Sequence, residues 1–174
     1  MLKKLVRKAH LPLSQVARRI YERVDMKPDT HAAINECLKP HSDGPLHSSL
    51  LASCHQYRAI RLHNCYIKCY EGDNCVKIEI VVPCDGNNSV RTESKIVLVR
   101  NIAKSDITVF LLFEEFLETD CFFSYPQDSS ELGIYLVKGL SGVKCIELNS
   151  RVTLQKYVML PHGDKYVALP LIHT

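Results

Sequence analysis

The sequence predicts an α+β chain: short N-terminal helices followed by a mainly antiparallel β domain, folded as a small barrel or a sandwich. Three observations predict this class: apolar residues at helical spacing in residues 11–24, a Pro- and Gly-rich break across residues 39–49, and alternation of period two from Tyr57 onward. We therefore expect a basic helical segment at residues 1–40, a linker at 41–56 and a β-rich domain at 57–174. The apolar fraction of 46% and the charged fraction of 24% are those of a globular protein.

The first helix is expected at residues 11–24, LPLSQVARRIYERV. Pro12 suits a first helical turn, Ser14 could cap it, and Pro28 ends the pattern. Apolar side chains recur at steps of three or four, as one face of a helix requires: Leu13, Val16, Ile20 and Val24. This stripe either packs into a core or docks on a partner.

A second short helix is expected from Asp29 or Thr30 to Leu38, because Pro40 stops it. The β segment then follows the Pro- and Gly-rich linker. In it the EGDN sequence at 71–74 and the HGD sequence at 162–164 predict tight turns. Strands are expected at 57–62, 65–70, 75–82, 95–102, 107–116, 134–137, 143–148, 152–160 and 165–172. Many short strands with frequent turns favour a barrel or sandwich.

Positive charge is concentrated at the N-terminus. The net charge of the chain is +3, yet residues 1–24 alone carry seven basic side chains against the single acid Glu22. The basic residues are Lys3, Lys4, Arg7, Lys8, Arg18, Arg19 and Arg23. They could neutralise nucleic-acid phosphates, or they could form a solvated helix face.

No secretory leader or membrane span is expected. Charged residues Arg7 and Lys8 interrupt the apolar start, and the most apolar run, Ile107 to Phe113, is far shorter than a span. We therefore expect an intracellular protein, nuclear or cytoplasmic, whose eight cysteines are thiols in a reducing compartment.

Soft metal ligands occur at modest spacing in the first strands: Cys54, His55, His63, Cys65, Cys69 and, further on, Cys75. They could bind zinc, or they could be ordinary buried or surface thiols. They include no Cys-x-x-Cys pair, and alternation places Cys65 and Cys69 on one strand face, which suits small apolar core residues equally well. No cofactor other than zinc is indicated, and no nucleophile turn, phosphate loop or metalloprotease motif occurs.

Two further groups have a functional and an ordinary interpretation. The acidic run Glu114, Glu115, Glu118 and Asp120 could bind metal, or it could form a solvated strand end. An aromatic set could build a cage or a base-stacking platform, or it could fill a core: Phe110, Phe113, Phe116, Phe122, Phe123, Tyr125 and Tyr135.

Several blocks recur together in a familiar order: LKKLVRKAHLPLSQVARRIYE, YRAIRLHNCYIKCYEGDNCVKI, VRNI, FFSYP with LGIYLV, and YVMLPHGDKYVALPLIHT. In this order the chain resembles the C-terminal part of proteins encoded by CACTA-type (EnSpm-like) DNA transposons. The resemblance covers most of the chain and implies transposon ancestry. It does not imply strand transfer, because the nuclease core of such proteins lies upstream and no position here matches its metal-binding carboxylates.

The sequence thus favours a non-enzymatic, transposon-derived accessory or interaction module, whose partner is a protein or a nucleic acid contacted by the basic N-terminal helix. Two alternatives stay open: an enzyme whose Cys/His or carboxylate site assembles only in the fold, and a fragment without selected activity.

Overall fold

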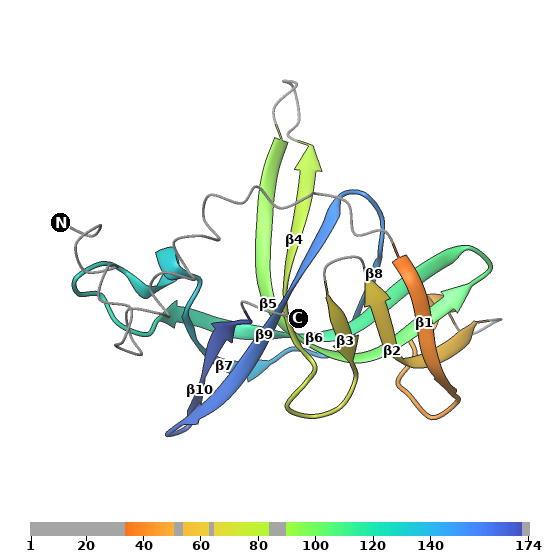
Figure 1. Ribbon diagram of the computed structural model, residues 1–174, viewed down its shortest axis with the longest axis horizontal. Coiled ribbons are helices and arrows are strands. Elements are labelled where there is room, and N and C mark those ends of the chain that lie inside the picture. The colour runs from red at the N-terminus through yellow and green to blue at the C-terminus, as the bar shows by residue number, and fades with distance from the viewer. Residues whose placement is uncertain (1–33, 51–53, 63–64, 84–89, 172–174) are drawn as a thin grey trace, which may run out of the picture. The chain divides into compact units, whose positions relative to one another are not determined.

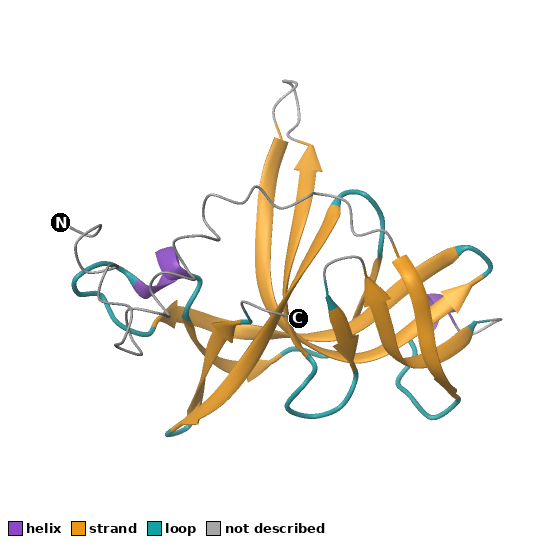
Figure 2. Ribbon diagram, viewed as in Figure 1, coloured by secondary structure: helices purple, strands orange, loops and turns teal. Residues whose placement is uncertain are grey.

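The computed structural model describes residues 34–50, 54–62, 65–83 and 90–171, all within the compact unit formed by Thr30–Ile172. In these ranges strands predominate, with two single-turn 3-10 helices, η1 (Ser48–Leu50) and η2 (Ser129–Leu132) (Figures 1 and 2). The strands are β1 (Ile34–His41), β2 (His55–Leu62), β3 (Tyr66–Lys68), β4 (Cys75–Pro83), β5 (Val90–Ser105), β6 (Thr108–Cys121), β7 (Tyr135–Leu140), β8 (Lys144–Glu147), β9 (Val152–His162) and β10 (Lys165–Pro170).

The strands pair antiparallel and close into a barrel. Following the hydrogen-bonded neighbours, the order β5-β4-β9-β10-β7-β6 returns to β5, because β5 and β6 also pair with each other. The remaining strands extend this barrel: β2 pairs with the end of β5 and carries β1 and β3, and β8 pairs with β6. At 16 and 14 residues, β5 and β6 exceed the usual strand length, and this length lets them serve both the barrel and the added strands.

Strand β5 separates two hydrophobic cores. Ile96 and Leu98 point into the barrel core, with Phe116, Val137 and Tyr157. The alternate residues of β5, Val97 and Val99, point into a second core formed with β2, β3, β4, β6 and β9. Because both faces are covered, residues 96–99 form a continuous buried run instead of alternating with polar residues.

A β-bulge in β5 then changes which residues face which core. Val99 pairs with Phe113 and Asn101 with Leu112, so Arg100 is the extra residue. As a result Val99 and Ile102, three positions apart, share the second core. On the other face of the sheet, Ala103 and Leu112 form a third cluster with Leu50. Partly buried side chains pack against this cluster: Leu46, Cys54, Phe110, Val143 and Cys145.

The prediction of an α+β fold was wrong for the residues the structure describes, because these ranges contain no α-helix. The second expected helix, ending at Leu38, overlaps β1, which pairs with β2 from Ile34↔Leu62 to His41↔Gln56. Strand pairing outweighs the weak helical preference of this short segment, and Pro40 is tolerated because β1 is an edge strand. The expected helix at 11–24 lies outside the described residues. The β-rich character of the chain is confirmed.

The expected turns lie between strands. Gly72 adopts a φ of 80° in the turn between β3 and β4, and Gly163 adopts a φ of 62° between β9 and β10. A side chain other than glycine would be strained at either position. No helix in the described ranges has the length and apolar character needed to cross a membrane.

Candidate nucleic-acid interface

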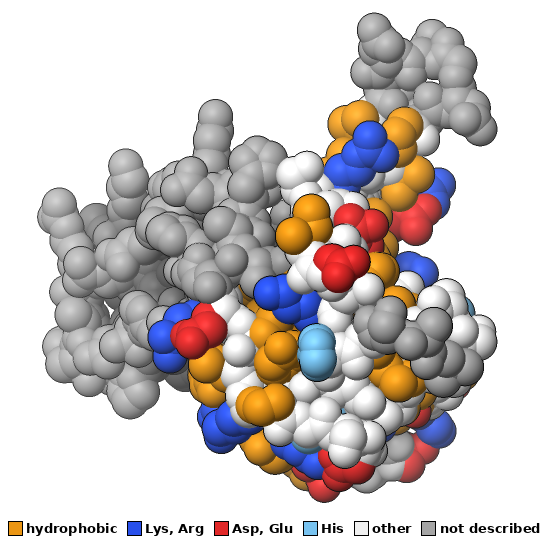
Figure 3. Space-filling model, turned by 90° about the vertical axis from the view of Figure 1, so that its right-hand side faces the viewer, with side chains coloured by type: hydrophobic (Ala, Val, Ile, Leu, Met, Phe, Trp, Pro, Cys, Tyr) orange, Lys and Arg blue, Asp and Glu red, His pale blue; other side chains and the backbone are white. Residues whose placement is uncertain are grey.

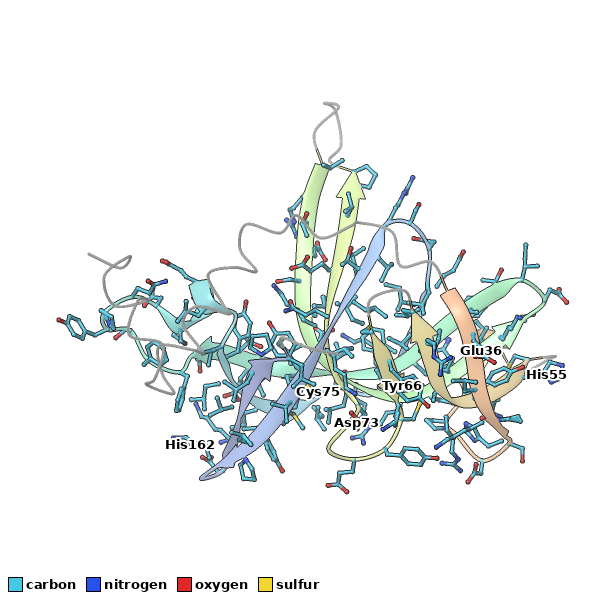
Figure 4. The ribbon with its side chains drawn as sticks, viewed as in Figure 1. Glu36, His55, Tyr66, Asp73, Cys75 and His162 are labelled. Atoms are coloured by element: carbon cyan, nitrogen blue, oxygen red, sulfur yellow. The ribbon has the colours of Figure 1, made fainter. Side chains whose placement is uncertain are left out.

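A row of side chains crosses the outer face of β1, β2 and β3. The register pairs Arg61 with Tyr66 on β3 and with Glu36 on β1, while the alternate pair, Ile60 and Ile67, is fully buried. The Arg61 guanidinium carbon lies 5.9 Å from the Tyr66 ring centroid, and its Nη1 lies 3.5 Å from Glu36 Oε2. Figure 4 labels Glu36 on β1 and Tyr66 on β3.

Two lysines extend this row. Lys68 Nζ lies 5.4 Å from the Tyr66 ring centroid, so Tyr66 contacts two cations. Lys39 Nζ lies 5.4 Å from the ring centroid of Tyr70, which follows β3 and is 40% exposed. We call Lys39, Arg61, Tyr66, Lys68 and Tyr70 the cation–tyrosine set.

An ion pair between a nearly buried lysine and a partly exposed aspartate adjoins this set. Lys156 of β9 is 9% exposed; its Nζ donates to the Tyr66 carbonyl at 3.0 Å and pairs with the Asp73 carboxylate. Asp73, labelled in Figure 4, lies in the turn before β4 and also binds Lys68 Nζ at 2.6 Å. Partial burial raises the pKa of Asp73, but hydrogen bonds from Lys156 and Lys68, together with their charges, outweigh burial and hold that pKa below its ordinary value.

The charge on the surface is mixed. On the face shown in Figure 3, Lys and Arg side chains are interspersed with Asp and Glu. Cations of β2 are paired with acids: Arg58 with Asp43, and Arg61 with Glu36. Binding of an anionic polymer here would therefore depend on aromatic contact as well as on charge.

The predicted metal ligands are divided among different environments. Cys65 is buried in the second core and Cys69 packs against it, whereas Cys75 lies in the barrel core and Cys54 packs against the third cluster. His55 is exposed at the start of β2, and His63 lies outside the described residues. Within the ranges that the structure describes, no three His, Cys, Asp or Glu side chains converge as a metal site would require.

The thiols of these strands are poor nucleophiles. Burial raises the pKa of Cys65 to about 11, although the Lys156 charge opposes it, and raises the pKa of Cys69 to about 12 against the opposing charge of Arg58. Burial also raises the pKa of Cys75 to about 12. A nucleophilic cysteine needs a lowered pKa, so these thiols act as apolar packing groups.

The acidic run forms ion pairs along β6. Glu114 accepts a hydrogen bond from Arg100 Nε at 2.6 Å, and Glu115 binds Lys144 at 2.7 Å and Lys95 at 3.3 Å. Partial burial raises the pKa of Glu115, but the two lysines outweigh burial and lower it. Asp120 lies 3.7 Å from Lys165, and Glu118 is opposite Lys138 in the register. Glu114, Glu115 and Asp120 are thus paired with cations, and the described carboxylates of this run do not converge as a metal site would require.

The aromatic set is split between cores and surface. Phe110, Phe113 and Phe116 belong to, or pack against, three different hydrophobic clusters. Tyr135 packs against the barrel core beside Tyr157. The exposed members are Phe122, Phe123 and Tyr125, and Phe122 makes edge contacts with the rings of Phe123 and His162.

The basic residues predicted to contact phosphates (Lys3, Lys4, Arg7, Lys8, Arg18, Arg19 and Arg23) lie outside the described residues. Sequence reasoning missed the cation–tyrosine set. In the sequence, basic residues and tyrosines do occur close together in YRAIRLHNCYIKCY, at positions 57–70. Recognising it required the strand register, which places Arg61 beside Tyr66.

No curated protein and no solved structure matches this chain. The family model described as a domain of unknown function (DUF8592) matches residues 40–171, about three quarters of the chain and all of β2 to β10. The chain therefore belongs to the DUF8592 family.

Proposed function

We propose that this chain is a non-enzymatic interaction module that binds single-stranded nucleic acid through the cation–tyrosine set. The observation that carries the proposal is the placement of Tyr66 beside Arg61 and Lys68, with Tyr70 beside Lys39. A tyrosine ring can stack on any base, and neighbouring cations can contact the phosphates on either side. The basic segment predicted at residues 1–24 would add affinity that does not depend on sequence.

The non-enzymatic part of the proposal is supported by the groups that could otherwise react. Among the described residues, the cysteines whose pKa is shifted are all shifted upward, mainly by burial. The carboxylates Glu114 and Glu115 are bound to Arg100, Lys95 and Lys144. Groups used in this way stabilise a scaffold and do not prepare a nucleophile or a metal site.

The resemblance to proteins of CACTA-type transposons is consistent with a nucleic-acid partner. Descent from such an element is part of the proposal. A transcript that joins this chain to an upstream nuclease-like region would support this descent. If the genes that encode this domain in related genomes all lack such a region, the descent would be opposed.

Fluorescence anisotropy with a labelled oligothymidine and the full chain tests binding directly. The variant Tyr66→Leu/Tyr70→Leu keeps apolar bulk and removes both rings, so we expect at least a roughly tenfold rise in Kd, since one stacked base contributes about 1–3 kcal/mol. Tyr166→Leu is the matched control, because Tyr166 on β10 is 43% exposed and Tyr70 is 40% exposed. Equal affinity of the double variant and the control would refute the role of the two rings.

The contribution of the N-terminal charge is tested separately. Lys3→Glu, Lys4→Glu, Arg7→Glu and Lys8→Glu together should weaken binding and flatten its decline between roughly 50 and 200 mM salt. An unchanged salt slope would remove the N-terminal segment from the interface. No binding by the unaltered chain at low salt would refute the proposed function.

A further inference from the structure

The buried side-chain amide of Asn101 on β5 determines which atoms donate and which accept in a series of linked hydrogen bonds. Asn101 is fully buried; its Nδ2 donates to the Pro45 carbonyl and to Gln56 Oε1, both at 2.8 Å, and its Oδ1 accepts from the Ile102 amide at 2.8 Å. A backbone carbonyl can only accept and a backbone amide can only donate, so the orientation of the Asn101 side chain is determined. Gln56 Oε1 also accepts from the Gly44 amide at 3.1 Å, which determines its orientation too.

These assignments determine the protonation of His41. Its Nε2 lies 3.0 Å from Asn101 Oδ1, an acceptor, so Nε2 carries a hydrogen. Its Nδ1 lies 2.7 Å from Asp43 Oδ1. Arg58 Nη2 donates to both oxygens of the Asp43 side chain, as it would to a carboxylate, so these oxygens can only accept. The Asp43 backbone amide nitrogen also lies near Nδ1, at 3.4 Å, but the carboxylate contact is much shorter and requires a proton between the two atoms. Both ring nitrogens therefore donate, and only the imidazolium form can do so.

The ring is placed where a change in its charge would have a structural effect. The His41 side chain is 9% exposed at the end of β1. The segment that follows, residues 42–50, brings Leu46 and Leu50 onto Ala103 and Leu112 of the β5–β6 sheet. Gly44 lies so close that a Cβ would come within 2.4 Å of Asn101 Nδ2 and 2.8 Å of His41 Cε1.

We propose that His41 is a pH-sensitive latch. In its doubly protonated form it ties Asp43 to Asn101 and holds residues 42–50 over the third hydrophobic cluster. When Nδ1 loses its proton, a lone pair faces a carboxylate oxygen at 2.7 Å, and the segment loosens. This inference does not depend on nucleic-acid binding.

The charged groups around the His41 ring favour the proposed latch. Asp43 is the anion that faces it, and Arg58 of β2 binds both oxygens of that carboxylate, at 2.5 and 2.6 Å, which keeps Asp43 ionised after His41 is neutral. Toward β5 the ring meets the neutral Asn101 amide. Other charged groups on these strands include Arg100, bound to Glu114; Glu36, near Arg61; Lys39, at the Tyr70 ring; and Lys104, which flanks Ala103. Asp43 is 69% exposed, so added salt should weaken the latch.

The direction of the effect follows from the proton count. Loss of the Nδ1 proton as the pH rises should release residues 42–50, and its return as the pH falls should secure them. His47 also lies inside the segment, where its Nδ1 hydrogen bonds with Ser49 Oγ at 2.8 Å, so a His47 variant is needed as a control.

Nitrogen-15 NMR of the full chain, labelled at histidine, observes the protons directly. At the acid end of a pH series we expect both His41 ring nitrogens to show protonated shifts, and as the pH rises only Nδ1 should change. In parallel, hydrogen exchange of residues 42–50, corrected for the intrinsic pH dependence, should lose protection several-fold. His41→Gln should remove this pH response, and His47→Gln should retain it.

Either of two results would overturn the latch: an unprotonated Nδ1 on His41 at the acid end of the pH series, or an equal pH response in His41→Gln and the unaltered chain. If His41→Gln fails to fold, the nitrogen-15 shifts of the unaltered chain decide the question on their own.

Discussion

The ammonium of Lys156 is bound between the carboxylate of Asp73 and the backbone carbonyl of Tyr66. This contact joins β9 to β3 and to the turn that leads into β4, next to Tyr66 of the proposed interface. A nearly buried cation with two oxygen partners is stable only while both partners remain.

Asp73→Asn should destabilise the fold because it leaves Lys156 charged, nearly buried and without its anion. We expect the free energy of unfolding to fall by about 2–3 kcal/mol, less than for a wholly buried pair because Asp73 is itself partly exposed. Asp164→Asn is the control, since it removes an exposed pair with Lys138 and should have little effect. Urea unfolding compares the two variants; equal midpoints would contradict the prediction.

Acid should weaken the fold through Asp73 and Glu115. Both have a pKa below the ordinary values of 3.8 and 4.5, so their stabilising effect is complete above those values and is lost as the pH falls through the lowered values. Between about pH 7 and pH 3, the urea midpoint of Asp73→Asn should therefore fall less than that of the unaltered chain. Glu71→Gln, an exposed change in the same turn, should leave the acid response intact.

Gly44→Ala should disrupt the contact between residues 42–50 and β5, since the added Cβ would meet the buried Asn101 side chain at 2.4 Å. We expect a loss of about 1–3 kcal/mol in the free energy of unfolding, as for other overpacked sites. Gly142→Ala places its Cβ in open space and should change stability by less than about 0.5 kcal/mol. A loss of similar size in both variants would mean that the close approach at Gly44 does not matter.

Thiol labelling of the native chain should be selective. Cys121 is exposed, whereas burial raises the pKa of Cys65 to about 11 and the pKa values of Cys69 and Cys75 to about 12. Iodoacetamide at neutral pH should therefore modify Cys121 well before these three, because the thiolate is the reactive form. Peptide mass spectrometry gives the order, and the differences should vanish in denaturant. Early modification of Cys75 in the native chain would show that the barrel core is open.

Local patterns in the sequence predicted part of the fold. Alternation of period two identified strands where one face is covered, and Gly72 and Gly163 marked turns that need positive φ. The same reasoning failed at β1, where a short segment ending at Leu38 has no strong local preference and takes its conformation from pairing with β2. It also left zinc binding and packed thiols as open alternatives, because spacing does not reveal that Cys54 and Cys75 face different clusters.

The sequence by itself determined that this is a β-rich chain with thiols in its strands and basic residues at its N-terminus. Only the tertiary structure decided that β5 divides two cores, that a bulge at Arg100 turns Asn101 toward His41, and that Arg61 lies beside Tyr66. The reason is physical: alternation depends on neighbours along the chain, whereas register, bulges and barrel closure depend on hydrogen bonds between strands far apart in sequence.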